Sequence, residues 1–453
     1  MNSALAQSKR PAVTPIRRRA RRYDNTDILV FFIPCLQFIH IHVIGLLEGS
    51  DLLMLAAFLS LAFRGKIRIA TPAGRKFLVL CSLWLISQIV TDIVRHSAFA
   101  DYTRGWSMIG LTLIGFVVLY TLLYERPRRF VLFGWGLVAG SVLTFIISPN
   151  ELAQGGPWKF GFSFPVNLGL FLLISGEKIR GVWPITLSAL MGVIDIVLGT
   201  RSRGEICLAA AFYLFATRLL NAKRKAGSRM KAGTILALVT SLILGVAGTS
   251  WAYQYAATAG ILGKEAKDKY EQESSGKYGV LLGGRPDLLG ALPAIYDSPI
   301  IGHGSWARDW TYLKAEEEAL HLLGYQGAVA MTREDYVEAT IPAHSYLLQA
   351  WVWAGIVGAV FWAWGFVFSA RTVMRIYPPT TPLLPLFAFV ALSLLWEILF
   401  SPFGEEVRIV FPYYMVMVMT FSSLAPRKAA RAATKMAKKK NQRRIATSTA
   451  API

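Results

Sequence analysis

Long apolar runs recur along nearly the whole chain, and they constrain the fold more than any other feature. Each run is about long enough to cross roughly 30 Å of hydrocarbon as a helix. Hydrophobic residues make up 54% of the 453 positions, and the mean hydropathy is +0.45, more apolar than a soluble protein of this length. The runs are continuous and do not alternate with polar residues, which excludes a membrane β-barrel. We therefore predict an all-α, polytopic helical membrane protein.

The sequence predicts about twelve transmembrane helices, with one large and mostly helical loop late in the chain. A basic segment at 1–26 leads into a full-length span, so no cleaved signal peptide is expected. Nine spans within 27–252 precede the loop at 253–343, three spans within 344–424 follow it, and the tail at 425–453 is polybasic. The predicted spans are 27–46, 48–64, 77–94, 104–124, 130–148, 162–177, 182–199, 204–220, 233–252, 344–369, 382–400 and 408–424.

Positive charge predicts the orientation of these spans. With a cytoplasmic N-terminus, 34 of the 48 lysine and arginine residues lie on the inner side. Positive residues in short loops stay on the cytoplasmic side of a membrane. Both termini are therefore predicted inside and the loop at 253–343 outside. The net charge of +21 mostly flanks spans, so anionic lipid headgroups, and not nucleic acid, are the expected partner.

Several kinds of site are not expected. Cys35, Cys81 and Cys207 fall within predicted spans, which argues against a structural disulfide or a metal cluster. His40 and His42 would point to different sides of a helix. The sequence has no acidic pair for a metal–nucleotide, no phosphate-binding glycine loop, no zinc-protease motif and no nucleophile elbow. No metal or cofactor is predicted.

Two arginines stand in a predicted outside turn, GTRSRGE (199–205). Most other short outside loops carry one positive charge or none, although the loop at 95–104 also carries two. Arginine offers a rigid fork of donors that suits phosphate oxygens. We interpret Arg201 and Arg203 as candidate anion ligands, with Gly199 and Gly204 giving an anion access to the backbone. Snorkelling towards lipid headgroups is the ordinary alternative.

A third arginine, Arg285, lies in GGRPDLLG (283–290) within the large loop. Pro286 is expected to begin a helix whose Leu289 and Leu292 face inward. A positive charge at a helix start opposes the helix dipole, so Arg285 is predicted to serve a group outside that helix. Solvation is the usual fate of a loop arginine.

The stretch PAHSYLLQAWVWAGIVG places a histidine at the mouth of an apolar helix. On one continuous helix, His344, Leu348, Trp351, Gly355 and Gly358 would form a single stripe. The two glycines would let another helix pack closely against that stripe. A helix N-terminus disfavours imidazolium, so His344 is expected to be neutral and able to accept a proton. An interfacial histidine without catalytic function is the alternative.

Two carboxylates, Asp195 and Glu397, fall within or near predicted spans. Intramembrane carboxylates are functional candidates by default. A salt bridge to a neighbouring helix, or a position nearer the interface, would explain them equally well.

These motifs together resemble the O-antigen ligase superfamily, integral membrane enzymes that handle undecaprenyl-diphosphate-linked glycans and include polymerases of O-antigen or exopolysaccharide. TRSRG (200–204) is similar to the serine–arginine turn of the family. RPDLL (285–289) fits its arginine, three residues, leucine pattern, and YDSPIIGHG (296–304) resembles the continuation of that segment in the family. HS and then GIVG, within 344–358, fits its histidine signature.

The resemblance is most specific over about 185–365, and it departs at Ala359, where the family often has threonine. Many spans with one large periplasmic loop also agree with the family. The resemblance implies a membrane-embedded, GT-C-like architecture in the bacterial inner membrane.

The resemblance also implies site residues. Arg203 and Arg285 would bind the diphosphate, with Arg201 as a helper, and His344 would act at the acceptor or at the leaving diphosphate. The implied enzyme is a metal-independent, inverting glycosyltransferase. Its partners would be an undecaprenyl-diphosphate glycan, a lipid A–core or other saccharide acceptor, membrane lipids and polysaccharide-assembly proteins.

Other functions are compatible with the same sequence. A polymerase would join lipid-linked repeat units instead of attaching a finished chain. A glycolipid flippase or transporter would share the twelve-span layout, although no two similar halves are evident. A non-catalytic assembly scaffold is a further alternative.

Overall fold

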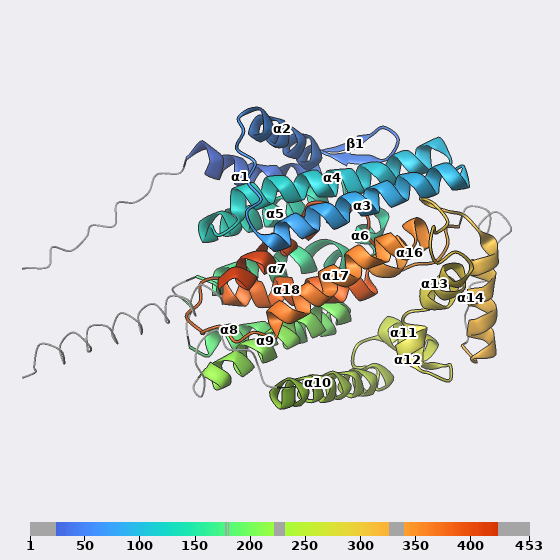
Figure 1. The fold of residues 1–453 in the computed structure, drawn as a ribbon. Coiled ribbons are helices and arrows are strands. Elements are labelled where there is room, and N and C mark those ends of the chain that lie inside the picture. Colours follow the sequence, from blue (N-terminus) through green and yellow to red (C-terminus); the bar gives the residue numbers. More distant parts are fainter. Residues whose placement is uncertain (1–23, 177–178, 180, 222–231, 326–338, 425–453) are drawn as a thin grey trace, which may run out of the picture.

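The computed structural model describes residues 24–176, 179, 181–221, 232–325 and 339–424, and it is almost entirely helical (Figure 1). Within these residues six helices are long and apolar enough to cross a membrane. They are Pro72–Arg95 (α3), Phe99–Leu123 (α4), Pro127–Ile147 (α5), Pro157–Ile174 (η2, Pro157–Phe162, with α7, Ser163–Ile174), Ile356–Val373 (α17) and Glu405–Leu424 (η3, Glu405–Val407, and a helix at 410–424).

Shorter helices complete the bundle. Four are apolar: Asn25–Phe38 (α1, Asn25–Cys35, with η1, Leu36–Phe38), Gly49–Phe63 (α2), Trp183–Val197 (α8) and Leu384–Phe400 (α18). Arg201–Asn221 (α9) and Ala232–Thr258 (α10) occupy the eighth and ninth predicted spans, and Glu151–Gly155 (α6) precedes η2. Each predicted span thus contains helix along at least part of its length. The chain is a helical membrane protein, as predicted, and the terminal segments 1–23 and 425–453 lie outside the described residues.

The first predicted span, 27–46, is wrong in its second half. The α-helix ends at Cys35, and His40–His42 (β1) then pairs antiparallel with Leu46–Glu48 (β2). In a strand, residues two apart share a face, so the helical argument that separated His40 from His42 does not apply.

Polar contacts explain why this apolar stretch leaves the helical conformation. Glu48 and Asp51 form a capping box that begins α2, so the preceding residues cannot continue a helix. Asp51 is paired with the buried Arg408 at 2.8 Å, and Arg408 also donates to the Leu46 carbonyl at 2.8 Å. The Leu46 amide donates to Glu405 at 3.3 Å. These long-range partners fix the hairpin.

The tenth predicted span, 344–369, is two helices separated by Gly355. Tyr346–Ala354 (α16) ends there and α17 begins, with Gly355 at φ +68°. A Cβ at this position would collide with the Ile300 carbonyl. Only glycine adopts such a backbone readily. The expected continuous stripe is therefore wrong, because His344 precedes α16 and Gly355 interrupts it.

The helix at 410–424 forms the centre of the bundle, and residues 410–421 are all buried. Its Tyr413 donates to the Phe130 carbonyl of α5 at 3.1 Å, and its ring stacks on Phe133 with centroids 5.1 Å apart. Phe411 packs against Trp362 of α17 at 4.6 Å. This helix therefore joins elements from both parts of the chain.

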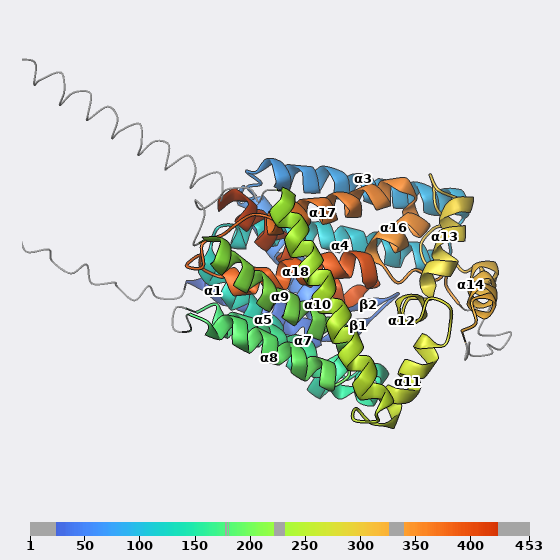
Figure 2. The same cartoon turned by 90° about the horizontal axis from the view of Figure 1, so that it is seen from below.

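A helical cap lies at one end of the bundle, as both views show (Figures 1 and 2). It contains Lys264–Ser274 (α11), Val280–Gly283 (α12), Asp287–Asp297 (α13) and Trp310–Leu322 (α14). These helices lie in the loop at 253–343, which was predicted to be mostly helical.

Asp92, near the end of α3, fastens the cap to the bundle. Its buried carboxylate accepts hydrogen bonds from the backbone N–H of Ser305 at 2.6 Å and from the Ser305 hydroxyl at 2.8 Å. Trp106 donates to the same carboxylate at 2.8 Å. Arg308 of the cap is also paired with Asp101 of α4 at 2.7 Å. Charge-assisted hydrogen bonds of this kind are about twice as strong as neutral ones.

Candidate functional site

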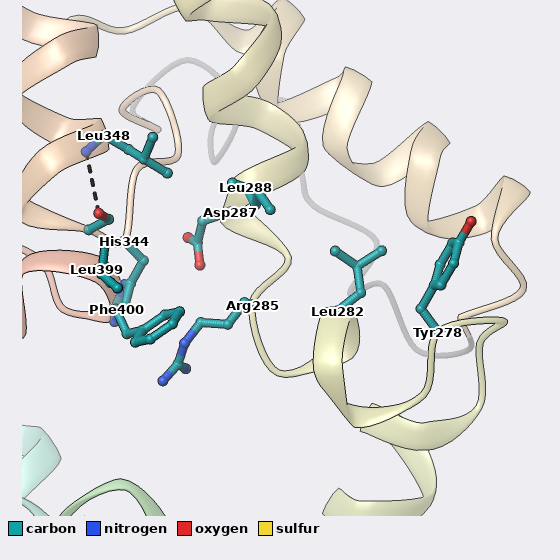
Figure 3. Close-up of a pocket in the computed structure, with 10 residues that line it drawn as sticks. Tyr278, Leu282, Arg285, Asp287, Leu288, His344, Leu348, Leu399 and Phe400 are labelled. Atoms are coloured by element: carbon teal, nitrogen blue, oxygen red, sulfur yellow. Dashed lines mark hydrogen bonds between the residues drawn. The ribbon is translucent and has the colours of Figure 1, made fainter. Parts of the chain in front are cut away.

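A cavity of about 430 Å³ lies between the cap and the helix bundle (Figure 3). Two sequence-predicted site residues, Arg285 and His344, line it together, although they come from different parts of the fold. The walls are otherwise mostly apolar or aromatic. The remaining lining residues are Tyr278, Leu282, Asp287, Leu288, Ser345, Leu348, Leu399 and Phe400.

Arg285 stands between α12 and α13, and Pro286 is the N-cap of α13, as predicted. The Arg285 guanidinium lies over the rings of Trp396 and Phe400, 5.7 and 5.6 Å from their centroids. One of its N–H groups donates to the Gly284 carbonyl at 2.8 Å. Aromatic faces hold a cation without occupying the donors at its edge.

Burial and nearby charges shift the pKa of Arg285 in opposite directions. Burial lowers the pKa of Arg285, and so does the charge of Arg201, whereas Asp287 raises it. Arginine stays protonated even with such a shift.

The two leucines of α13 that were expected to face inward differ in exposure. Leu289 is partly buried, whereas Leu292 is half exposed, in contrast with expectation.

His344 immediately precedes Ser345, the N-cap of α16. The Ser345 hydroxyl accepts from the Leu348 amide at 3.3 Å and donates to the Ile398 carbonyl of α18 at 3.0 Å. The cap residue thus fixes the backbone beside the histidine. The His344 side chain is exposed at the cavity wall, and Figure 3 shows His344, Asp287 and Arg285 around the same space, with the Phe400 ring beside them.

The pKa of His344 is lowered, first because the cavity walls limit solvation of imidazolium and also because Arg285 is positive. Asp287 opposes this shift and raises the pKa. The lowered pKa agrees in direction with the expectation of a neutral His344 ring. Its cause differs from the expected one, because the surrounding walls and Arg285 lower the pKa, whereas the prediction relied on the helix dipole.

Arg201 and Arg203 do not line the cavity. Arg201, at the start of α9, is paired with Glu273 of α11 at 2.6 Å and lies over the Tyr253 ring at 4.9 Å. Its charge acts on Arg285, so the two arginines are electrostatic neighbours. Arg203 lies 5.2 Å from the Phe164 ring centroid and interacts with the charge of Glu397 in α18.

The glycines have separate roles. Gly355 separates α16 from α17, and its lack of a Cβ leaves room for the Ile300 carbonyl. A Cβ at Gly358 would lie 2.5 Å from the Ala350 carbonyl and 3.1 Å from Trp84 of α3, so this glycine does permit close packing. Gly204 packs against the Gly192 carbonyl of α8. Its backbone is therefore used for helix packing and does not face an anion site.

The two intramembrane carboxylates have neutral hydrogen-bond partners. Asp195 is fully buried and accepts from Trp158 at 3.0 Å and from Asn167 at 2.7 Å, which ties α8 to η2 and α7. Glu397 accepts from the Tyr346 hydroxyl at 3.1 Å. Asp195 thus has a structural role, while Glu397 lies beside α16 and near Arg203.

Sequence reasoning missed two residues that line the cavity, Asp287 and Phe400, and it missed Glu273, which pairs with Arg201. Asp287 follows Pro286 in the first helical turn, where acidic residues are favoured, so it could have been noted. Glu273 and Phe400 gave no signal, because only the fold brings them to the arginines. Within the described part of the chain, no group of three His, Cys, Asp or Glu side chains could hold a metal ion.

No protein-family model matches the sequence, and no curated protein matches it.

Proposed function

We propose that the protein is an O-antigen ligase-like membrane glycosyltransferase, which moves a glycan from undecaprenyl diphosphate to a lipid A–core or other saccharide acceptor. One observation supports this most: Arg285 and His344, far apart in sequence, share one cavity beneath the cap. The proposal includes twelve spans, a GT-C-like architecture and a bacterial inner-membrane location with both termini cytoplasmic.

In the proposed reaction, an acceptor hydroxyl attacks the anomeric carbon of the lipid-linked glycan. The carbon–oxygen bond to the diphosphate breaks, its electron pair stays on the diphosphate oxygen, and the anomeric centre is inverted. His344 takes the proton of the hydroxyl, a contribution of about 10²–10⁴-fold. Its lowered pKa keeps the ring neutral and ready to accept that proton.

Arg285 would stabilise the negative charge that develops on the leaving diphosphate. Its guanidinium is held by ring faces, so its edge donors can reach phosphate oxygens. A preplaced donor of this kind contributes roughly 3–4 kcal/mol to the transition state. Arg201 and Arg203 would extend the positive region, and the activated donor supplies the energy.

Incubation of purified protein with an undecaprenyl-diphosphate glycan and separate candidate acceptors tests the proposal, with products resolved by mass. We expect ligated product from the wild type and a loss of about 10²-fold or more in His344→Ala and Arg285→Ala. His321→Ala is the matched control, because His321 is an exposed histidine of the cap outside the cavity.

The same assay separates the other candidate functions. Elongated lipid-linked glycan without ligation would replace the ligase by a polymerase. Wild-type rates in both cavity variants would refute the site assignment. Flipping of glycolipid by reconstituted vesicles, with no bond made or broken, would replace the enzyme by a flippase.

A further inference from the structure

A second cavity, also of about 430 Å³, lies where α1 and α5 begin and α2 and α4 end. It is far from the first cavity, because α4 extends from one region to the other. Asp101 in the first turn of α4 binds the cap, and Leu122 in its last turn lines the second cavity. A helix of 25 residues is about 37 Å long. The two cavities therefore lie near opposite ends of α4, the long helix that runs along the bundle in Figure 1.

Five basic side chains line this second cavity: Arg64, Lys66, Arg68, Arg126 and Arg129. Arg129 is the one whose charge is matched, by Asp27 at 3.0 Å and Asp24 at 3.4 Å. Among the described residues, the other four form no salt bridge. The cavity therefore holds a surplus of positive charge.

The backbone adds to this surplus. Arg126 is the N-cap of α5, so the positive end of that helix dipole faces the cavity. Arg126 donates to the carbonyls of Thr121 and Leu122 at 3.0 Å, contacts that carry no full negative charge. Burial, and then the charge of Arg129, lower the pKa of Arg126, while Asp24 and Asp27 raise it in part. The salt bridges of these two aspartates are with Arg128 and Arg129.

Apolar surface continues from the cavity along the outside of the bundle. On α2, Phe63 is 88% exposed immediately before Arg64, and Leu59 is 45% exposed. On α1, Ile28 is half exposed. An acyl chain could lie along these side chains while its headgroup enters the basic cavity. This arrangement favours a membrane lipid over a soluble anion.

We propose that this cavity binds a phosphate group, carried by the headgroup of an anionic phospholipid or by a soluble phosphate compound. The inference does not depend on the proposed glycosyl transfer, because no residue of the second cavity belongs to the first. Basic cavities between membrane helices recognise lipid phosphates through the same Lys and Arg chemistry.

The test uses the full chain in nanodiscs of phosphatidylcholine with increasing fractions of phosphatidylglycerol. Bound phosphatidylglycerol is counted by native mass spectrometry, and the thermal unfolding midpoint is recorded in parallel. The site variant is Arg64→Gln with Lys66→Gln. The matched control is Arg75→Gln with Lys76→Gln, which removes the same charges from exposed positions outside the cavity.

We expect the wild type to retain phosphatidylglycerol and to unfold at a higher temperature as its fraction rises. The site variant should bind it about tenfold or more weakly, and the control should resemble the wild type. A parallel series with inorganic phosphate in phosphatidylcholine nanodiscs identifies the source. A response to phosphate alone would assign the cavity to soluble phosphates. Equal losses in both double variants, or no response to either probe, would overturn the proposal.

Discussion

At the scale of single residues, the charges around His344 control when it can accept a proton. Asp287 raises the pKa of His344, while limited solvation and Arg285 lower it. Removing the Asp287 carboxylate should therefore lower the pKa further, because imidazolium loses its attractive partner. We predict that Asp287→Asn moves the acidic limb of the pH–rate profile to lower pH.

The sign follows from the role of a base. A base works when neutral, so the transfer rate falls as pH drops through its pKa, and a lower pKa delays that fall. The measurement is the initial transfer rate across a pH series. Asp309→Asn is the control, since this partly exposed cap residue is not among the charges that shift the pKa of His344. An acidic limb that stays in place or moves upward would contradict the electrostatic account.

In the proposed site, Glu273 would compete with a donor phosphate for Arg201. Its carboxylate accepts at 2.9 and 2.6 Å from the same guanidinium nitrogen. A partly exposed pair of this kind contributes about 1 kcal/mol, so its loss should improve donor binding by about fivefold.

We therefore predict that Glu273→Gln lowers the KM for the lipid-linked donor and leaves kcat nearly unchanged. Steady-state kinetics with a titrated donor measures this. Glu271→Gln is a suitable control, because Glu271 lies on the same helix and is paired only weakly with Lys267 at 3.8 Å. An unchanged or higher KM in Glu273→Gln would mean that Arg201 does not bind the donor.

At the scale of elements, the interruption between α16 and α17 depends on one glycine. Gly355→Ala would place a Cβ against the Ile300 carbonyl in a backbone conformation unfavourable to L-residues. Gly365 is the matched control within α17, because its Cβ would meet Ile398 only at 3.9 Å. We predict that Gly355→Ala costs about 1–3 kcal/mol and that Gly365→Ala is tolerated. Thermal unfolding in detergent compares the two variants. Equal unfolding midpoints would refute the prediction that alanine is strained at position 355.

The elements show how far the sequence could lead. Apolar runs predicted the bundle helices because twenty or so apolar residues have one stable state in hydrocarbon. The strands around His40 and the break at Gly355 could not be predicted, because Arg408, Glu405 and Ile300 impose them from far along the chain. Arg285 and His344 were found through their motifs. Their common cavity, and the aromatic contacts of Arg285, follow only from the packing of the cap on α18.

At the scale of the whole molecule, exposed positions at the two ends of the bundle provide a test of orientation. The proposed topology puts the cap outside and the loop between α2 and α3 inside. We predict that Tyr296→Cys, at a position 86% exposed on the cap, reacts with a membrane-impermeant maleimide in spheroplasts. Lys66→Cys should react only after lysis. The native cysteines are buried and give a low background. The reverse pattern would place the candidate site in the cytoplasm.

The central position of the helix at 410–424 also affects how the protein is made. Its side chains fill the space between α3, α5 and α17, which all precede it in the chain. Until the ribosome has produced residue 424, those earlier helices face one another across an incomplete interior. Final closure around this helix must therefore come late in biogenesis, after the preceding helices have already entered the bilayer.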